Sequence, residues 1–156
     1  MTRKYANTEL GQIHYQDLGS GEPIVLLHQT ASSSVMYERS FPYLKTNNRI
    51  IAIDTPGFGL SDPPLGPDNI IEHYSNAVSM VLDDANIEKA HVVGFHTGAT
   101  TAIDFSTRFQ ERIKSLTIFC VLALMPDERD EWLARDDLSE RWEPDGEGLF
   151  LEKNIL

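Results

Sequence analysis

The chain has 156 residues, which is enough for about one domain with a buried core. Its net charge of −11 disfavours nucleic-acid binding, because an acidic surface is repelled by phosphate groups. A single cysteine excludes a disulfide framework, and no apolar run reaches the roughly 18 residues that span a bilayer. We therefore expect a cytoplasmic protein that does not enter a membrane.

Apolar periodicity predicts an opening hairpin followed by alternating strands and helices. In the second hairpin strand, polar and apolar residues alternate, which places His14 on an exposed face. The later strands are apolar without alternation, as in parallel strands covered on both faces. The predicted strands are 3–8, 11–18, 24–27, 49–54, 91–95 and 114–124. The predicted helices are 32–44 with a break at Pro42, 69–85 capped by Asn69, and 99–108.

This order of elements predicts an α/β fold with a doubly wound, mostly parallel sheet. Ligands of such sheets bind beyond the carboxyl ends of the strands. His28, Asp54 and His96 each follow a predicted strand, so we expect them to mark one end of the sheet.

Three motifs resemble those of the α/β-hydrolase family, of the esterase, haloalkane dehalogenase and epoxide hydrolase type. Residues 94–98, Gly-Phe-His-Thr-Gly, have the spacing of the nucleophile elbow G-x-S-x-G, a sharp strand-to-helix turn. His28-Gln29-Thr30 resembles the loop that carries the oxyanion hole, and residues 54–62 match D-x-x-G-x-G-x-S-D. The resemblance covers residues 10–125 and implies the N-terminal part of that fold, incomplete at its C-terminal edge.

The resemblance also implies roles for individual residues. Gly94 and Gly98 are the structural glycines of the elbow, and the backbone N–H groups of Thr30 and Thr97 are the oxyanion donors. The nucleophile position carries His96 in place of serine. His96 is then a nucleophile or base, a non-catalytic residue of a ligand pocket, or a metal ligand with His28. For the metal no third ligand is found, and His28 is better explained as a residue that bonds the loop backbone.

We divide the chain into a core at 1–125 and the beginning of a helical cap at 126–156. The strands that would carry the family's catalytic histidine lie beyond the sequence, so we expect a fragment that is inactive by itself. The apolar strand 116–124 would then form an open edge prone to oligomerisation.

The function expected from the resemblance is hydrolysis of a small ester, lactone or halide by the full-length protein. The alternatives are a non-catalytic ligand-binding pseudo-hydrolase and a cofactor-independent reaction with His96 as base. No cofactor is expected, because residues 94–98 lack the three-glycine dinucleotide pattern, and no metal is expected, because His28 and His96 have no third ligand. The expected partner is a small-molecule substrate or ligand.

Overall fold

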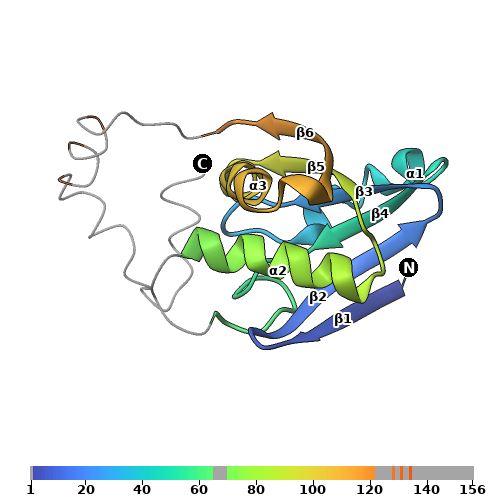
Figure 1. Ribbon diagram of the computed structural model, residues 1–156, viewed down its shortest axis with the longest axis horizontal. Helices are drawn as coiled ribbons and strands as arrows, with labels where there is room; N and C mark the ends of the chain where they lie inside the picture. The colour runs from blue at the N-terminus through green and yellow to red at the C-terminus, as the bar shows by residue number, and fades with distance from the viewer. Residues whose placement is uncertain (1, 65–69, 122–127, 129–130, 132–133, 135–156) are drawn as a thin grey trace. The chain divides into compact units, whose positions relative to one another are not determined.

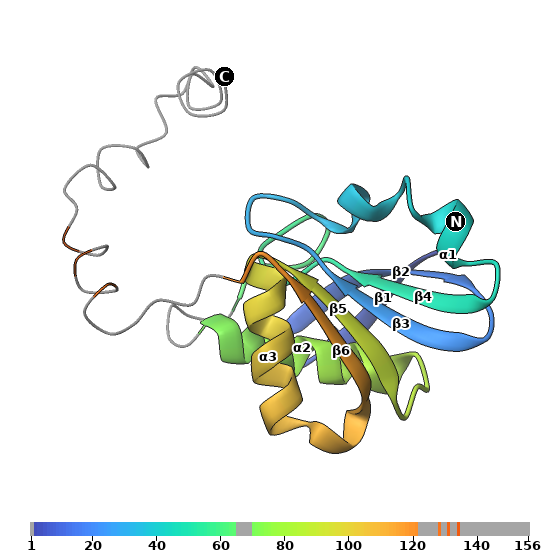
Figure 2. The same ribbon diagram turned by 90° about the horizontal axis from the view of Figure 1, so that it is seen from above.

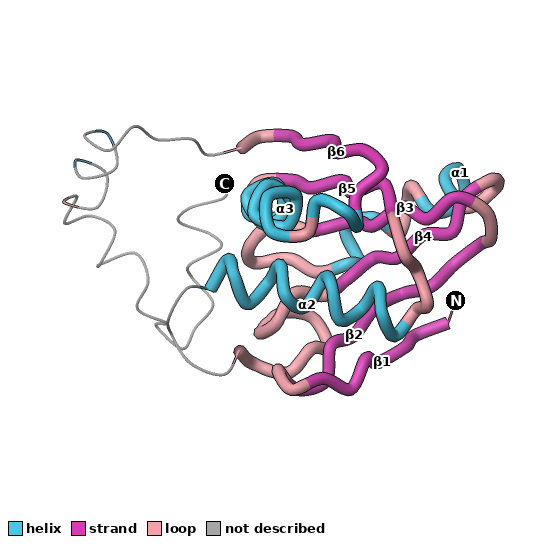
Figure 3. The backbone as a smooth tube through the Cα atoms, viewed as in Figure 1, coloured by secondary structure: helices cyan, strands magenta, loops and turns pink. Residues whose placement is uncertain are grey.

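The computed structural model describes residues 2–64 and 70–121, together with the single residues 128, 131 and 134. Within these ranges six strands form one sheet in the order β1-β2-β4-β3-β5-β6 (Figures 1 and 3). Their bounds are β1 Thr2–Thr8, β2 Gly11–Gly19, β3 Glu22–Leu27, β4 Asn48–Ile53, β5 Ala90–Phe95 and β6 Ile113–Phe119. The pairs β1–β2 and β2–β4 are antiparallel, and the other pairs are parallel. The predicted mostly parallel α/β sheet is confirmed.

The central strands β3 and β4 are apolar on both faces because both faces are covered. On one face, Val25, Leu27, Ile51 and Ile53 belong to a large core cluster with residues of the helices α2 (Ile70–Asp84) and α3 (Thr97–Arg108). These two helices lie side by side over that face (Figure 2). Helices therefore cover one of the two faces of these apolar strands.

The opposite face is covered by two short helical segments, η1 (Ser34–Tyr37, a 3₁₀ helix) and α1 (Phe41–Leu44). Phe41 packs there against Leu26, Ile50 and Ala52. The predicted helix from 32–34 to 44 is interrupted, as expected, but the interruption lies at 38–40 and not at Pro42. Pro42 does not break a helix but stands in the first turn of α1, where a missing N–H costs no hydrogen bond.

The other predicted element boundaries agree with the structure only in part. Strand β6 ends at Phe119, and Cys120 follows with a φ of 54°, a left-handed conformation that cannot continue a strand. Residues 122–124 of the predicted strand, the Asn69 cap and nearly all of the proposed cap at 126–156 lie outside the described residues. A compact unit spans Met1–Leu122, and no helix in the described part is long and apolar enough to cross a membrane.

Candidate functional site

A single residue, His96, connects the end of β5 to the start of α3. Its backbone has φ 53° and ψ −115°, a combination that side-chain-bearing residues rarely adopt. Hydrogen bonds hold the turn in place: the His96 N–H donates to the Phe119 carbonyl at 3.0 Å, and the His96 carbonyl accepts from Ala99 N–H at 2.9 Å. The imidazole is exposed. This is the strand-to-turn-to-helix arrangement that the motif predicts.

The two glycines around His96 are required by close backbone approaches. A Cβ on Gly94 would overlap the Gly98 carbonyl and lie 2.7 Å from the Ala99 Cα. A Cβ on Gly98 would overlap the Leu27 carbonyl and lie 2.7 Å from the His28 carbonyl oxygen. Real Cβ atoms do not approach other atoms so closely, so both positions admit only glycine without movement of the backbone.

The structure brings Thr30 and Thr97 together although they are 67 positions apart in the sequence. Their hydroxyl oxygens are 2.5 Å apart, and the Thr30 N–H donates to Thr97 Oγ1 at 3.3 Å. His96 Nδ1 faces the same Thr97 oxygen at 3.4 Å. The Thr97 hydroxyl therefore accepts the hydrogen bond of the Thr30 N–H, the donor that the resemblance assigns to an oxyanion. A bound oxyanion would have to displace this hydroxyl.

His28 is buried and engaged by the loop backbone. Thr55 N–H donates to His28 Nε2 at 3.1 Å, which leaves the proton on Nδ1, and Nδ1 donates to the Gln29 carbonyl at 2.7 Å. Burial lowers the pKa of His28, because the charged imidazolium is poorly solvated there. His28 thus holds the Gln29 loop, as the structural interpretation predicted. No group of three or more potential metal ligands occurs in the part of the chain that the structure describes.

Asp54 is also committed to the surrounding loops. Its carboxylate accepts hydrogen bonds from Ser34 N–H at 2.7 Å and Leu60 N–H at 3.0 Å, and it lies 2.8 Å from His14 Nδ1. Burial opposes ionisation of Asp54, but these hydrogen bonds outweigh it and lower the pKa of the carboxyl group. Of the three side chains at strand ends, only His96 remains free for chemistry.

The prediction that His14 is exposed was wrong. The residue is 2% exposed, because η1 and the loop after β4 cover the polar face of β2. Ser61 contributes to this cover: its hydroxyl accepts from His14 N–H at 2.9 Å and donates to the Asp54 carbonyl at 2.6 Å. Alternation alone could not reveal this cover, since polar residues on a strand do not show whether solvent or polar side chains face them.

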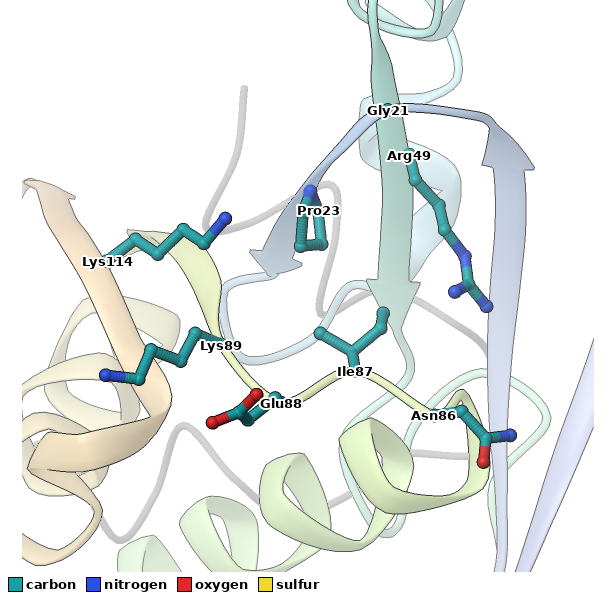
Figure 4. A pocket seen from close by; sticks show the side chains of 8 residues that line it. All are labelled: Gly21, Pro23, Arg49, Asn86, Ile87, Glu88, Lys89 and Lys114. Atoms are coloured by element: carbon teal, nitrogen blue, oxygen red, sulfur yellow. The ribbon is translucent and has the colours of Figure 1, made fainter.

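A cavity of about 400 Å³ lies at the amino ends of the parallel strands, beside Pro23 and Lys89 (Figure 4). Two of its cationic side chains are already paired, since Arg49 binds Asp17 and Lys114 binds Glu22. His96 lies at the other, carboxyl ends of these strands. Ligands of open α/β sheets bind at the carboxyl ends of the strands, so we place the candidate site at His96.

Comparison with known proteins decides the family. The family model described as "alpha/beta hydrolase fold" matches residues 22–144. The chain belongs to the α/β-hydrolase fold family. It is 31% identical over 110 residues to a 2-hydroxy-6-oxo-6-phenylhexa-2,4-dienoate hydrolase of Comamonas testosteroni, a match that covers 68% of this chain and 38% of that enzyme.

Solved structures of hydrolases resemble this α/β-hydrolase at the level of the fold. The N-acyl homoserine lactonase AidH superposes with a TM-score of 0.73 and 26% identity, covering 78% of this chain and 45% of that one. The meta-cleavage product hydrolase CumD of Pseudomonas fluorescens IP01 gives 0.67 and 28%, covering 74% of this chain and 43% of that one. The chain thus spans less than half the length of these relatives.

Proposed function

We propose that the whole protein hydrolyses a small ester or lactone, and that the imidazole of His96 attacks its carbonyl carbon. The observation that carries the proposal is the strained backbone of His96, which presents an exposed imidazole beside Thr30 and Thr97. Such a conformation costs on the order of 1–3 kcal/mol and is characteristic of functional sites. The names of the similar hydrolases, of an oxo-dienoate and of a homoserine lactone, support a carbonyl substrate.

The chemistry follows from the free nitrogen of His96. Nδ1 faces Thr97, whereas Nε2 makes no hydrogen bond within the described part of the chain. Attack by the lone pair of Nε2 on the carbonyl carbon forms a tetrahedral oxyanion, for which the N–H groups of Thr30 and Thr97 are the donors. The C–O bond then breaks and the alcohol leaves with the imidazole proton. Water hydrolyses the acyl-imidazole, releasing the acid and restoring His96.

A histidine favours acyl substrates over halides. An acyl-imidazole is readily cleaved by water, because imidazole is a good leaving group from a carbonyl carbon. Displacement of a halide would instead alkylate the ring nitrogen, and that C–N bond is not hydrolysed. We therefore place esters and lactones ahead of halides.

The test is acylation of His96 in the whole protein during turnover of p-nitrophenyl acetate. Wild type and His96→Ala are compared, with His91→Ala as a matched control because His91 is a partly exposed histidine on β5. We expect an acetyl group on His96 by mass spectrometry after rapid quenching, and a rate loss on the order of 10²-fold or more in His96→Ala alone. An unchanged rate in His96→Ala would contradict the proposal.

A non-catalytic ligand-binding role is the second candidate, favoured by one observation. The Thr30 N–H already donates a hydrogen bond to the Thr97 hydroxyl, and no acid within the described residues orients His96. In that case a homoserine lactone would bind wild type and His96→Ala saturably without turnover. The third alternative, His96 as a base, predicts turnover that His96→Ala abolishes without any acetylated intermediate.

A further inference from the structure

We propose that a pocket between β2, η1 and the loop after β4 binds a small molecule through a primary ammonium group. The pocket has a volume of about 280 Å³, and its lining includes His14, Gln16, Ser34, Val35 and Leu60. We call it the β2 pocket. Thr30, His96 and Thr97 are not part of its lining, so this proposal does not depend on the proposed hydrolysis.

Two residues that line the β2 pocket each carry a buried polar atom without a hydrogen-bond partner among the described residues. His14 is 2% exposed and Gln16 is 3% exposed, yet His14 Nε2 and Gln16 Oε1 both lack a partner within that part of the chain. Buried polar atoms in native proteins are almost always hydrogen-bonded, because leaving one unpaired is unfavourable. Two such atoms in the lining of one cavity indicate a missing partner rather than a packing defect.

The bonds made by the other ends of these side chains fix what the unpaired atoms can accept. His14 Nδ1 lies 2.8 Å from the Asp54 carboxylate oxygen Oδ2, which can only accept, so Nδ1 carries a proton, and in the neutral imidazole the lone pair then lies at Nε2. Gln16 donates from Nε2 to Ser34 Oγ at 3.1 Å, which leaves Oε1 as its free end. A ligand with at least two donor hydrogens would satisfy both Gln16 Oε1 and the Nε2 of a neutral His14.

The remaining lining favours an ammonium ion with a short apolar body. An ammonium group has three N–H donors on one atom and no acceptor, which matches two buried acceptors. The Asp54 carboxylate behind His14 and the Glu38 carboxylate, on an exposed residue, both attract a cation, while Arg3 partly opposes them. Val35 and Leu60 are 59% and 49% exposed and can cover the hydrocarbon part of the ligand.

The proposal is tested by nuclear magnetic resonance titration of the full chain with n-butylammonium chloride, using 1-butanol as the uncharged control. We expect saturable shifts of the Gln16 side-chain amide and of the His14 imidazole signals with the ammonium only. Gln16→Met removes the acceptor at similar length and should weaken binding at least tenfold. Glu38→Gln, an exposed change, should weaken it by up to about fivefold.

His96→Ala is the matched control and should bind n-butylammonium as wild type does. Absence of saturation, equal binding by Gln16→Met, or equal shifts with 1-butanol would overturn the proposal. So would a structure in which an ordered water alone bridges His14 Nε2 and Gln16 Oε1 in the presence of the ammonium. If Gln16→Met fails to fold, the comparison of Glu38→Gln with wild type and of the ammonium with 1-butanol still decides.

Discussion

Gly98 approaches the Leu27 carbonyl oxygen so closely that any side chain on Gly98 would overlap it. Through this contact the first turn of α3 rests directly on the carboxyl end of β3. The same approach sets the position of His96 relative to the loop that follows β3, which contains Thr30. The geometry of the candidate site therefore depends on a residue that carries no functional group.

The first prediction concerns this contact. Gly98→Val should destabilise the fold by about 2–4 kcal/mol, through overpacking and forced backbone movement. His96→Ser, at an exposed position two residues away, should leave the free energy of unfolding within about 1 kcal/mol of wild type. Urea unfolding followed by circular dichroism measures both. Equal losses in the two variants would show that His96 is a packing residue and that the site is wrongly assigned.

The second prediction uses the strain at His96. His96→Gly should raise the free energy of unfolding by about 1 kcal/mol, because glycine adopts a φ of 53° without steric cost. The relief of strain should exceed the cost of the additional conformational entropy that glycine loses on folding. His96→Ala retains the Cβ and should show no gain. Both variants should lose hydrolytic activity. A stability of His96→Gly below that of His96→Ala would show that the turn is not strained.

The succession of strands and helices along the chain and the position of the elbow could be predicted because both depend on local pattern. Apolar runs without alternation identify buried parallel strands, and the glycine spacing at 94–98 identifies a turn in which His96 is the exposed residue. The α/β class and the family follow from these features, and both are confirmed.

The environments of His14 and Thr97 could not be predicted, because they depend on contacts between distant segments. The polar face of β2 resembles a solvated one, yet His14 meets Asp54, 40 positions further along the chain. Nor does the sequence show that the Thr97 hydroxyl would accept a hydrogen bond from the Thr30 N–H, since that contact depends on the relative positions of β3 and α3.

The third prediction concerns pH. Burial lowers the pKa of His28 below its ordinary value of 6.5, so between these two pKa values the unfolded chain binds more protons than the folded one. The free energy of unfolding therefore does not depend on His28 above about pH 6.5, and it decreases as the pH falls towards the pKa of His28 in the folded chain. His28→Gln retains an acceptor for Thr55 N–H but does not titrate.

Unfolding measured at pH 7.5 and 5.5 tests this assignment. Wild type should lose stability between the two values, by up to about 1.4 kcal/mol per pH unit, and His28→Gln should lose less. The lowered pKa of Asp54 acts only at more acidic pH, because its ordinary value is 3.8. An identical loss in both proteins would assign the pH dependence to other groups.

The last prediction concerns the outer strand β6, which within the described residues pairs with β5 alone. Leu116 and Ile118 share one face of β6 and are 37% and 40% exposed, and Phe119 is 53% exposed. An apolar outer strand with unpaired backbone groups is a template for pairing with another chain. We expect the 156-residue chain to self-associate through β6.

Ile118→Lys should shift the chain towards the monomer in sedimentation velocity experiments, because a charge on this face must stay solvated. Tyr43→Lys is the matched control, since Tyr43 on α1 is 82% exposed and the change also replaces an apolar side chain with lysine. A monomeric wild type, or an equal shift in both variants, would exclude β6 as the contact.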